Sequence, residues 1–493
     1  METDQPVYDG KKKAMEQKSI ITAIVLTFAM LGAMLSGCTS AAPEQIQLSV
    51  NGEEYVLPLT ERDTVDLVTL STEFDAEVAV ANYRQFDRIS VDEVQLKKGV
   101  AAVPVDQIGK DKFLALNWTR GTQSGTVLLR TLHPLVPDIL ASGTATSPGD
   151  FYLSYVYRRL IQKTDNAGNL LFYRVNPEMV DLVDGQPQSN GWWDFKKHVS
   201  DGVTYYSYHA PDPAQADKAF AGYNPGKRVL MDERYRPVQE FQLLGSRDGF
   251  VKEGDPIDGH DFWFFSPEHY IMSAYILRDG VYAAYLQEVE NGKVVFDWWS
   301  TEHPEMALWL DPAFRETAGA DYVHFNAIDI LPDGNWLCSF RHVSSLVKID
   351  RADETGDILW RIDGTSLPRT YDFHGQHYAR WHQDDGGSFI TLFNNGNGQG
   401  ATSMVRLDVD LANGAVSGGT RLIADGHFSE ACGALTFSGE NAIVGWGIPE
   451  GSQSGPFRLL TEYDATGHAV FFLHLNIEDR VTGPLASYRC IKM

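Results

Sequence analysis

The feature that most constrains the fold is a four-strand pattern that recurs along the chain. The clearest copy runs from His324 to Trp360 and contains an apolar strand, a Pro-Asp-Gly-Asn turn and three further short strands. The next copy begins at Gln376 and repeats the plan, with a turn at 384–387 and a strand over 389–393. Asp-Gly and Gly-Asn pairs suit such turns because they tolerate a positive φ. A small antiparallel sheet repeated in this way predicts a β-propeller, in which each blade packs against its neighbours.

Looser copies of the same pattern bring the number of expected blades to six. They begin near Trp193, His260 and Cys432, and an opening copy covers 151–175. A propeller closes when its last strand pairs with the first blade, and we expect the tail around 486–489 to do this. The sequence therefore predicts an all-β chain with a six-bladed β-propeller over residues 146–493.

The region before the propeller is expected to form a smaller domain. From residue 46 onward, stretches such as Gln47-Leu48-Ser49-Val50 alternate between polar and apolar residues, as half-buried strands do. Pro, Gly, Ser and Thr concentrate between residues 134 and 149, which indicates a domain boundary. Aromatic residues reach 12% and glycines number 44, a mixture that favours strands and tight turns over helices. We expect residues 46–145 to form an N-terminal β-sandwich.

The first segment has the pattern of an export signal. Lysines between positions 11 and 18 precede an apolar run from Ile20 to Leu35, which is short for a membrane span. The run ends in Leu35-Ser36-Gly37-Cys38, which looks like a lipoprotein cleavage box. We expect a signal peptide over 1–37, lipidation of Cys38 and a tether over 38–45. The protein would then be exported and anchored by lipid to the cell envelope, on its periplasmic or extracytoplasmic face. The alternative is an uncleaved anchor followed by a chance cysteine.

Charge and cysteine content limit the partners. The formal net charge is −25, and a field of that sign repels phosphate backbones, so nucleic acid is not an expected partner. A small anionic substrate would need a local basic pocket. Beyond Cys38 the chain has Cys338, Cys432 and Cys490, whose wide separation fits neither a dense disulfide framework nor a CxxC zinc site. One disulfide is compatible with this spacing, and none is required.

Three histidines occupy equivalent positions at the start of successive copies of the pattern. They are His260, His324 and His377, and residues that begin the inner strands of propeller blades converge near the axis. Asn326 follows His324 by one pleat period and so lies on the same strand face. Arg341 ends the next strand of that copy, and its planar guanidinium suits a tetrahedral oxyanion. A nearby cation also lowers the pKa of imidazoles and keeps them neutral and nucleophilic.

The residues around these positions resemble a known family. The runs concerned are Asp321-Tyr322-Val323-His324-Phe325-Asn326, Ser339-Phe340-Arg341-His342 with the strand Val347-Lys348-Ile349-Asp350, Gly375-Gln376-His377 with Phe393-Asn394-Asn395-Gly396, and His260-Asp261-Phe262. Together they resemble the motifs of the bacterial arylsulfate sulfotransferases, well over residues 258–447 and more weakly in the N-terminal domain. Two features depart from that family: Asn394 stands where its pattern has Asp, and the pair of nearby cysteines found in enterobacterial members is missing.

The resemblance implies a six-bladed propeller that transfers sulfate from a phenolic sulfate ester to another phenol, with no nucleotide sulfate donor and no cofactor. It implies a ping-pong reaction in which His377 is the nucleophile that becomes sulfated. His324, Asn326 and Arg341 would bind the sulfate, and His260 would assist proton transfer. The partners would be small aryl sulfates and phenols, besides the membrane that holds the lipid.

Other interpretations remain open from the sequence. Converging histidines could bind a metal, although no metal-ligand spacing is present and Arg341 within the group argues against it. The chain could be a noncatalytic lipoprotein propeller that binds a ligand or partner proteins. It could also be a hydrolase that uses water as the acceptor. The residues His342, His374 and His382 lie off the inner-strand phase and are expected behind the site or on the surface.

Overall fold

The computed structural model describes the chain from residue 45 onward with several short gaps. The described residues are 45–59, 62–177, 182–183, 186–187, 191–220, 222–316, 318–352, 354–398, 400–423, 427–449, 457–475 and 486–493. The expected signal peptide, Cys38 and the tether up to residue 44 lie outside them. Strands dominate the described part, and its helical elements are short 3-10 turns, so the all-β prediction is confirmed. No helix of this part is long and apolar enough to cross a membrane.

The chain divides into two compact units. The smaller unit contains the residues up to Val65 together with Ala76–Val103 and Phe113–Leu129. The larger unit contains Asp66–Asp75, Pro104–Lys112 and Arg130–Met493. Two short segments from the N-terminal third of the chain therefore belong to the larger unit.

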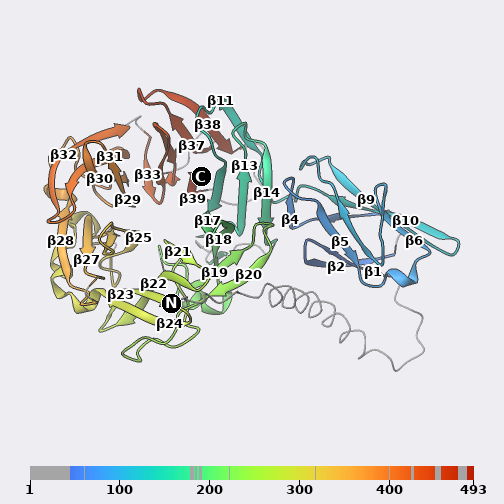
Figure 1. Ribbon diagram of the computed structural model, residues 1–493, viewed down its shortest axis with the longest axis horizontal. Coiled ribbons are helices and arrows are strands. Elements are labelled where there is room, and N and C mark those ends of the chain that lie inside the picture. Colours follow the sequence, from blue (N-terminus) through green and yellow to red (C-terminus); the bar gives the residue numbers. More distant parts are fainter. Residues whose placement is uncertain are drawn as a thin grey trace, which may run out of the picture. The chain divides into compact units, whose positions relative to one another are not determined.

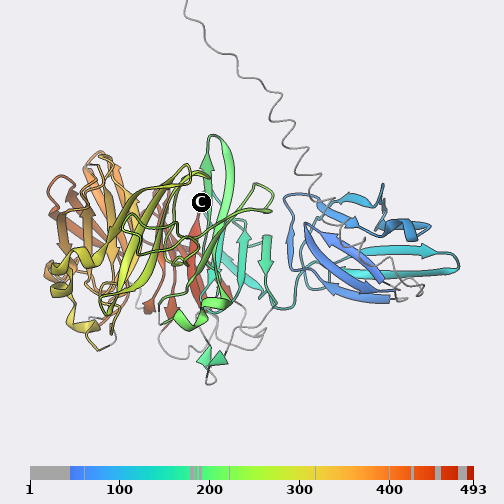
Figure 2. The same cartoon turned by 90° about the horizontal axis from the view of Figure 1, so that it is seen from below.

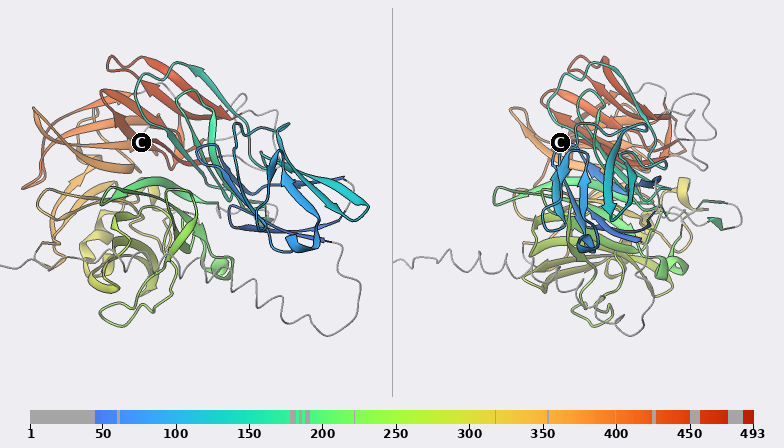
Figure 3. Two further views of the ribbon diagram at one scale, coloured as in Figure 1. Left: turned by 45° about the vertical axis from the view of Figure 1, so that its right-hand side comes forward. Right: turned by 90° about the vertical axis from the view of Figure 1, so that its right-hand side faces the viewer.

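The smaller unit consists of two antiparallel sheets, whose strands are coloured blue to cyan in Figure 3. The first has the order β2 (Glu53–Pro58), β1 (Gln45–Val50), β5 (Ala76–Val80), β8 (Val100–Val103). The second has the order β3 (Arg62–Asp66), β10 (Gln123–Arg130), β9 (Phe113–Arg120), β6 (Arg88–Val91), β7 (Val94–Gln95), and η1 (Tyr83–Gln85) precedes β6. In β1, Ile46, Leu48 and Val50 are buried while their neighbours are more exposed, as the alternation in the sequence predicted.

The larger unit contains six sheets of four or five strands among its described residues, arranged around a common centre in Figure 1. Figure 2 shows the same sheets after a quarter turn. Three four-stranded sheets are β17 (Trp193–Ser200), β18 (Val203–Pro211), β19 (Gly226–Met231), β20 (Pro237–Phe241); β21 (Trp263–Ser266), β22 (His269–Arg278), β23 (Val281–Glu290), β24 (Lys293–Trp299); and β25 (Phe325–Ile330), β26 (Trp336–Phe340), β27 (Ser345–Ile349), β28 (Ile358–Asp363). The fourth is β29 (His377–Asp384), β30 (Gly387–Asn394), β31 (Ser403–Asp410), β32 (Ala415–Ile423). These consecutive antiparallel strands match the four-strand pattern of the sequence.

The two five-stranded sheets join distant parts of the chain. One has the order β39 (Ser487–Lys492), β12 (Phe151–Tyr155), β13 (Leu160–Thr164), β14 (Leu170–Val175), β4 (Thr69–Ser71). The other has the order β11 (Ile139–Gly143), β38 (Ala469–Leu475), β37 (Phe457–Tyr463), β35 (Asn441–Gly445), β34 (Ala434–Ser438). The C-terminal strand β39 pairs with β12, as expected for the tail, with Phe151 opposite Lys492. This pairing brings Tyr488 and Arg489 to the centre of the unit, where both are buried.

Several shorter elements lie between the sheets. They are β15 (Leu182–Val183), β16 (Gln186–Pro187), β33 (Ser429–Ala431), β36 (Ile448–Pro449), η2 (Pro213–Lys218), η3 (Ser300–Glu302), η4 (Pro304–Trp309), η5 (Pro312–Phe314) and η6 (Gly364–Ser366). The stretch that breaks the strand pattern after β24 is thus a series of three 3-10 turns. Proline begins η4 and η5, where its missing N–H does no harm.

Apolar side chains pack between neighbouring sheets and hold them together. Trp298 on β24 and Trp336 on β26 are 2% and 1% exposed and belong to one cluster that joins two sheets. Each fully buried side chain of this kind contributes about 2 kcal/mol of burial free energy before entropy is subtracted. The described cysteines Cys338, Cys432 and Cys490 are all buried and free.

Candidate active site

The structure brings the three predicted histidines together at the centre of the larger unit. The ring centroids of His260 and His324 are 4.9 Å apart, and the rings are nearly perpendicular. Both of these rings, together with Arg341, lower the pKa of His377 in addition to the effect of burial. His260, His324 and His377 are 2%, 4% and 2% exposed, so they form a buried group of imidazoles.

His260 is held by a carboxylate two residues earlier in the chain. Asp258 accepts a 2.9 Å hydrogen bond from the backbone N–H of His260 and lies 2.8 Å from its Nδ1. The carboxylate can only accept from Nδ1, so Nδ1 carries a proton and Nε2 is left for other partners. Tyr488 donates a 2.9 Å hydrogen bond to the backbone carbonyl of His260, and Trp193 packs with its ring at a steep angle to the imidazole. These contacts fix both the ring and the backbone of His260.

His324 has a similar carboxylate partner but an unusual backbone. Its φ is +51°, in the left-handed region that non-glycine residues rarely adopt. Asp321 accepts from its backbone N–H at 3.2 Å and lies 2.5 Å from its Nδ1, so both bonds hold this conformation. Burial lowers the pKa of His324 well below its usual value, with smaller contributions from His260 and Arg341. Burial also raises the pKa of Asp321 to about 6.

A loop glycine covers the ring of His324. A Cβ at Gly222 would stand 2.4 Å from Cε1 of His324, so only glycine allows this approach. The φ of Gly222 is +87°, which also favours glycine. The ring is therefore enclosed by backbone on one side.

His342 lies directly behind His324, as its position off the inner-strand phase suggested. The two rings stack with centroids 4.6 Å apart and planes at 28°, and Nδ1 of His342 is 2.7 Å from the backbone carbonyl of Asp321. Burial lowers the pKa of His342 to about 3, so this ring is neutral at ordinary pH. Ligand atoms of Asp321, His324 and His342 lie within 4.8 Å of one another. Stacked rings whose Nδ1 atoms already face Asp321 do not direct their lone pairs at one ion, so the group fits a metal poorly.

His377 begins β29 and is held by an amide instead of a carboxylate. The side-chain nitrogen of Asn395 donates to the backbone carbonyls of Ser429 and Cys432, at 2.9 Å and 3.1 Å. These bonds fix the amide so that its oxygen faces Nδ1 of His377 at 2.7 Å, and Nδ1 must therefore carry the proton. The lone pair of the ring is then on Nε2, toward which the backbone N–H of Cys432 points at 3.3 Å.

The environment of His377 keeps its imidazole neutral. Burial lowers its pKa well below the usual value, and the positive charge of Arg341 is the next largest cause. A neutral imidazole with a free Nε2 lone pair is the nucleophilic form. Cys432 and Gly433, which adopt φ values of +63° and +99°, place the N–H beside this atom.

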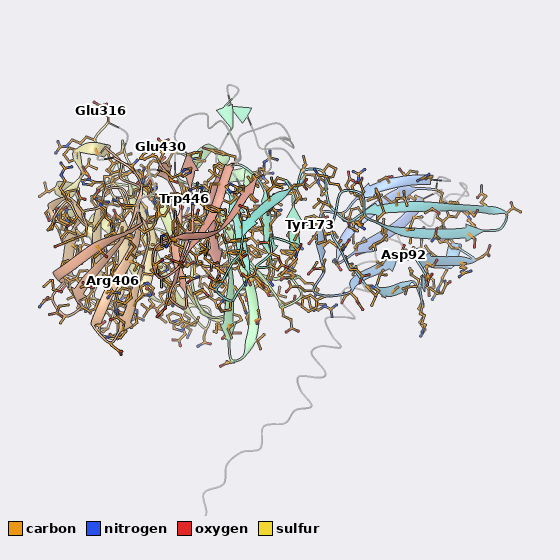
Figure 4. The ribbon with its side chains drawn as sticks, turned by 90° about the horizontal axis from the view of Figure 1, so that it is seen from above. Asp92, Tyr173, Glu316, Arg406, Glu430 and Trp446 are labelled. Atoms are coloured by element: carbon orange, nitrogen blue, oxygen red, sulfur yellow. The ribbon has the colours of Figure 1, made fainter. Side chains whose placement is uncertain are left out.

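Arg341 follows β26 and supplies the positive charge of the site. Its backbone N–H donates to the carbonyl of His324 at 2.8 Å, and one terminal nitrogen donates to the carbonyl of Glu430 at 3.1 Å. Its Nε is buried and has no hydrogen-bond partner among the described residues, which also provide no ion pair for the guanidinium. A buried guanidinium N–H without a partner is a donor that an anion can use. Figure 4 labels Glu430 near one edge of the larger unit.

Asn326 lies fully buried on β25 and links two sheets. Its side-chain nitrogen donates to the backbone carbonyl of Gln376 at 2.6 Å, and its Oδ1 has no partner among the described residues. Arg489 donates to its backbone carbonyl at 3.0 Å. Asn326 is thus anchored next to the residue that precedes His377.

Sequence reasoning missed four residues that orient the histidines: Asp258, Asp321, Asn395 and Tyr488. The two aspartates had a local signal, because each precedes its histidine by two or three residues. The roles of Asn395 and Tyr488 depend on contacts between distant parts of the chain, and no local pattern indicates them.

Comparison with known proteins gives a match to one family model. Residues 278–471 match the family model described as Arylsulfotransferase (ASST). No curated protein matches the sequence. Similar solved structures include a protein of unknown function from Bacteroides caccae, at 11% identity over 70% of this chain and 99% of that chain with a TM-score of 0.40. Virginiamycin B lyase from Staphylococcus aureus matches at 12% identity over 81% of this chain and 98% of that chain, with a TM-score of 0.34. The matched segment contains His324, Asn326, Arg341 and His377, and the match over residues 278–471 supports the arylsulfotransferase family.

Proposed function

We propose that this protein is an aryl sulfotransferase that moves a sulfuryl group from a phenolic sulfate ester to a phenolic acceptor through His377. The observation that carries the proposal is the pairing of a neutral imidazole, whose Nε2 lone pair accepts only from the backbone N–H of Cys432, with the guanidinium of Arg341, whose buried Nε has no partner among the described residues. The first is a nucleophile and the second binds an anion. An aryl sulfate supplies an anionic group with an electrophilic sulfur atom.

In the first half-reaction, Nε2 of His377 attacks the sulfur atom and the bond from sulfur to the phenolic oxygen breaks. The leaving phenolate takes the proton on Nε2 of His260, which is doubly protonated at the start of this step and whose Nδ1–H stays bound to Asp258. The sulfated ring becomes positively charged, and its Nδ1–H remains bound to the oxygen of Asn395. Donor phenol then leaves, and the sulfuryl group stays on the enzyme.

In the second half-reaction, an acceptor phenol loses its proton to His260 and its oxygen attacks the sulfur atom. The bond between sulfur and Nε2 breaks, which restores His377. The second half-reaction is the chemical reverse of the first, with a different phenol. One site can therefore perform both, and the order of the reaction is ping-pong.

The sulfuryl oxygens would be bound by donors around Nε2. Arg341 offers its buried Nε, and the side-chain nitrogen of Asn326 has a second hydrogen to donate beside the one bound to Gln376, while the ring of His324 lines the position of the sulfuryl group. The N–H of Cys432 points to the Nε2 lone pair of the free enzyme. Once Nε2 is bonded to sulfur that lone pair is used, so the same N–H becomes available to a sulfuryl oxygen.

We also propose that the six sheets of the larger unit are the blades of a six-bladed β-propeller and that the smaller unit is a β-sandwich. Antiparallel order within each sheet and the pairing of the C-terminal strand β39 with β12 support this architecture. Export and lipidation at Cys38 are part of the same proposal. Cys38→Ala should release the protein from the membrane fraction, and an unchanged membrane fraction would contradict the anchor.

The test of the reaction uses protein that lacks residues 1–38, with 4-nitrophenyl sulfate as donor and a second phenol as acceptor. We expect nitrophenol release that depends on the acceptor and is lost in His377→Ala. His382→Ala is the matched control, since His382 lies on the same strand and binds Thr391 away from the site. Release that does not need an acceptor would indicate a hydrolase, and no release with any of several aryl sulfates would favour a noncatalytic binding protein.

A metal enzyme is the second candidate, because Asp321, His324 and His342 lie close together. Metal analysis of the purified protein distinguishes the two. Stoichiometric metal whose removal abolishes turnover would favour the metal enzyme, whereas full turnover in the presence of a chelator would favour transfer through His377.

A further inference from the structure

We propose that Phe314 is a positioning residue, which holds Arg341 and, through His342, also His324 in the orientation that binds the sulfuryl group. This inference rests on the proposed function. Phe314 lies in η5, outside the strands of every sheet, and is 3% exposed. Phe314 contacts Arg341 and His342, and we infer that it acts through these neighbours.

The contacts of Phe314 form a stack. Cζ of Arg341 lies 4.6 Å from the centre of its ring, and the ring of His342 lies 5.1 Å away with the planes at 26°. His342 in turn stacks on His324 at 4.6 Å. One aromatic ring from η5 therefore supports two of the predicted sulfate-binding residues, one directly and one through a neutral imidazole.

The face-on contact determines which part of Arg341 is free. Cζ of Arg341 lies over the ring of Phe314 and a terminal nitrogen donates to the carbonyl of Glu430, while Nε has no partner among the described residues. Hydrogen bonds of a guanidinium lie in its plane, so the sulfuryl oxygens would be bound at this edge. Loss of the ring would let the guanidinium rotate away from that position.

The η5 turn itself is fixed to the loops that carry the site. Asp311 caps the turn by accepting from the N–H of Ala313 at 3.0 Å, and its other oxygen accepts from the hydroxyl of Ser344 at 2.7 Å. That second oxygen also lies 3.2 Å from Nδ1 of His374. The turn is thus bonded to the loop after Arg341 and to the loop before His377.

The ring of Phe314 also contacts the second loop. A Cβ at Gly375 would stand 2.7 Å from Cζ of Phe314, so the ring tip touches the backbone two residues before His377. Tyrosine would place its hydroxyl at this point, so Phe314→Tyr is not a suitable conservative variant. Leucine and methionine keep apolar volume but lack an aromatic face.

The experiment measures transfer from 4-nitrophenyl sulfate by Phe314→Leu, Phe314→Met and Arg341→Lys, and by the double variant of Phe314→Leu with Arg341→Lys. In both Phe314 variants we expect KM for the donor to rise by about tenfold, with a smaller fall in kcat. In the Arg341→Lys background, Phe314→Leu should cause a clearly smaller loss than in the wild type, because only its effect through His342 and His324 remains. Phe389→Leu is the matched control: Phe389 stacks with Arg406 at 3.7 Å, and Arg406 is labelled toward the opposite edge from Glu430 in Figure 4.

Equal and independent losses in the two backgrounds, or unchanged kinetics in both Phe314 variants, would overturn the inference. If Phe314→Leu or Phe314→Met no longer melts cooperatively, the other of these two variants is used. A crystal structure of the folded variant reports the orientation of Arg341 directly. If the wild type transfers no sulfate, the proposed function fails on its own. The structure of the variant then still decides whether Phe314 orients Arg341, since an unmoved guanidinium would overturn that role.

Discussion

Two histidines of the site are held in the same way by chemically different partners. In the His260 pair, which is His260 with Asp258, a carboxylate accepts from Nδ1. In the His377 pair, which is His377 with Asn395, an amide oxygen accepts from Nδ1 at nearly the same distance. Both partners leave Nε2 to face the substrate, so the difference lies in charge and not in geometry.

The charge of the partner decides what each ring can do. A carboxylate stabilises an imidazolium, so the His260 pair can hold a proton during the reaction. A neutral amide stabilises it much less, and Arg341 further lowers the pKa of His377. Within the proposed function, the comparison therefore favours proton transfer by His260 and nucleophilic attack by His377.

The largest expected effect is the loss of the nucleophile. His377→Ala should lower kcat for transfer by about 10⁴-fold or more, because no other group takes its place. Wild-type protein incubated with donor alone should gain the mass of one SO3 group, and the variant should not. The peptide that contains residue 377 should carry this mass. A stable adduct on another residue would show that the two pairs have been assigned wrongly.

The next effect should depend on the leaving group. His260→Ala removes the proton donor, which contributes about 10²–10⁴-fold in reactions of this kind. We expect the full loss with donors whose phenolate is a poor leaving group, and a small loss with 4-nitrophenyl sulfate. A series of substituted phenyl sulfates measures this dependence. If the loss were the same for every donor, His260 would have a role in binding instead.

A smaller effect is expected when the carboxylate of the His260 pair is replaced by an amide like that of the His377 pair. Asp258→Asn keeps an oxygen for Nδ1 of His260 but removes the negative charge, as in the His377 pair. Transfer from poor donors should fall by about 10–100-fold, while His377 should still become sulfated by 4-nitrophenyl sulfate. Unchanged rates with all donors would show that the carboxylate of Asp258 only orients the ring.

Much of the sheet structure could be predicted because its determinants are local. The turn between β25 and β26 contains Gly334 at a φ of +84°, and Asp-Gly-Asn in the sequence indicates this conformation. Short, mostly apolar and buried runs on either side then define the strands. In contrast, β4 (Thr69–Ser71) has only three residues and pairs with β14, about a hundred positions later, so no local pattern could reveal it.

In the site, too, some residues could be predicted from local sequence patterns and others could not. His260, His324 and His377 could be found because they stand at equivalent positions, at or just before the first strand of a sheet, and Arg341 because it directly follows a strand. The left-handed backbone of His324 could not be predicted, since histidine does not favour it and the bonds to Asp321 and the cover of Gly222 stabilise it. The fixed orientation of the Asn395 amide could not be predicted either, because it depends on backbone carbonyls of residues more than thirty positions later.

The effect expected to be smallest for catalysis concerns His209, a buried histidine whose Nδ1 has no partner among the described residues. Its Nε2 lies 2.6 Å from the carbonyl of Asn224, and burial lowers its pKa to about 4. The unfolded chain binds a proton at this residue below about pH 6.5, whereas the folded protein does so only near pH 4. The folded state must therefore lose stability as the pH falls between these values, by about 3 kcal/mol in total.

In His209→Gln this contribution is absent, so the free energy of unfolding, measured with urea at pH 6.5 and pH 4.5, should fall less than in the wild type. His468→Gln removes an exposed histidine and serves as the control, and equal slopes in wild type and His209→Gln would show that His209 is not the residue responsible.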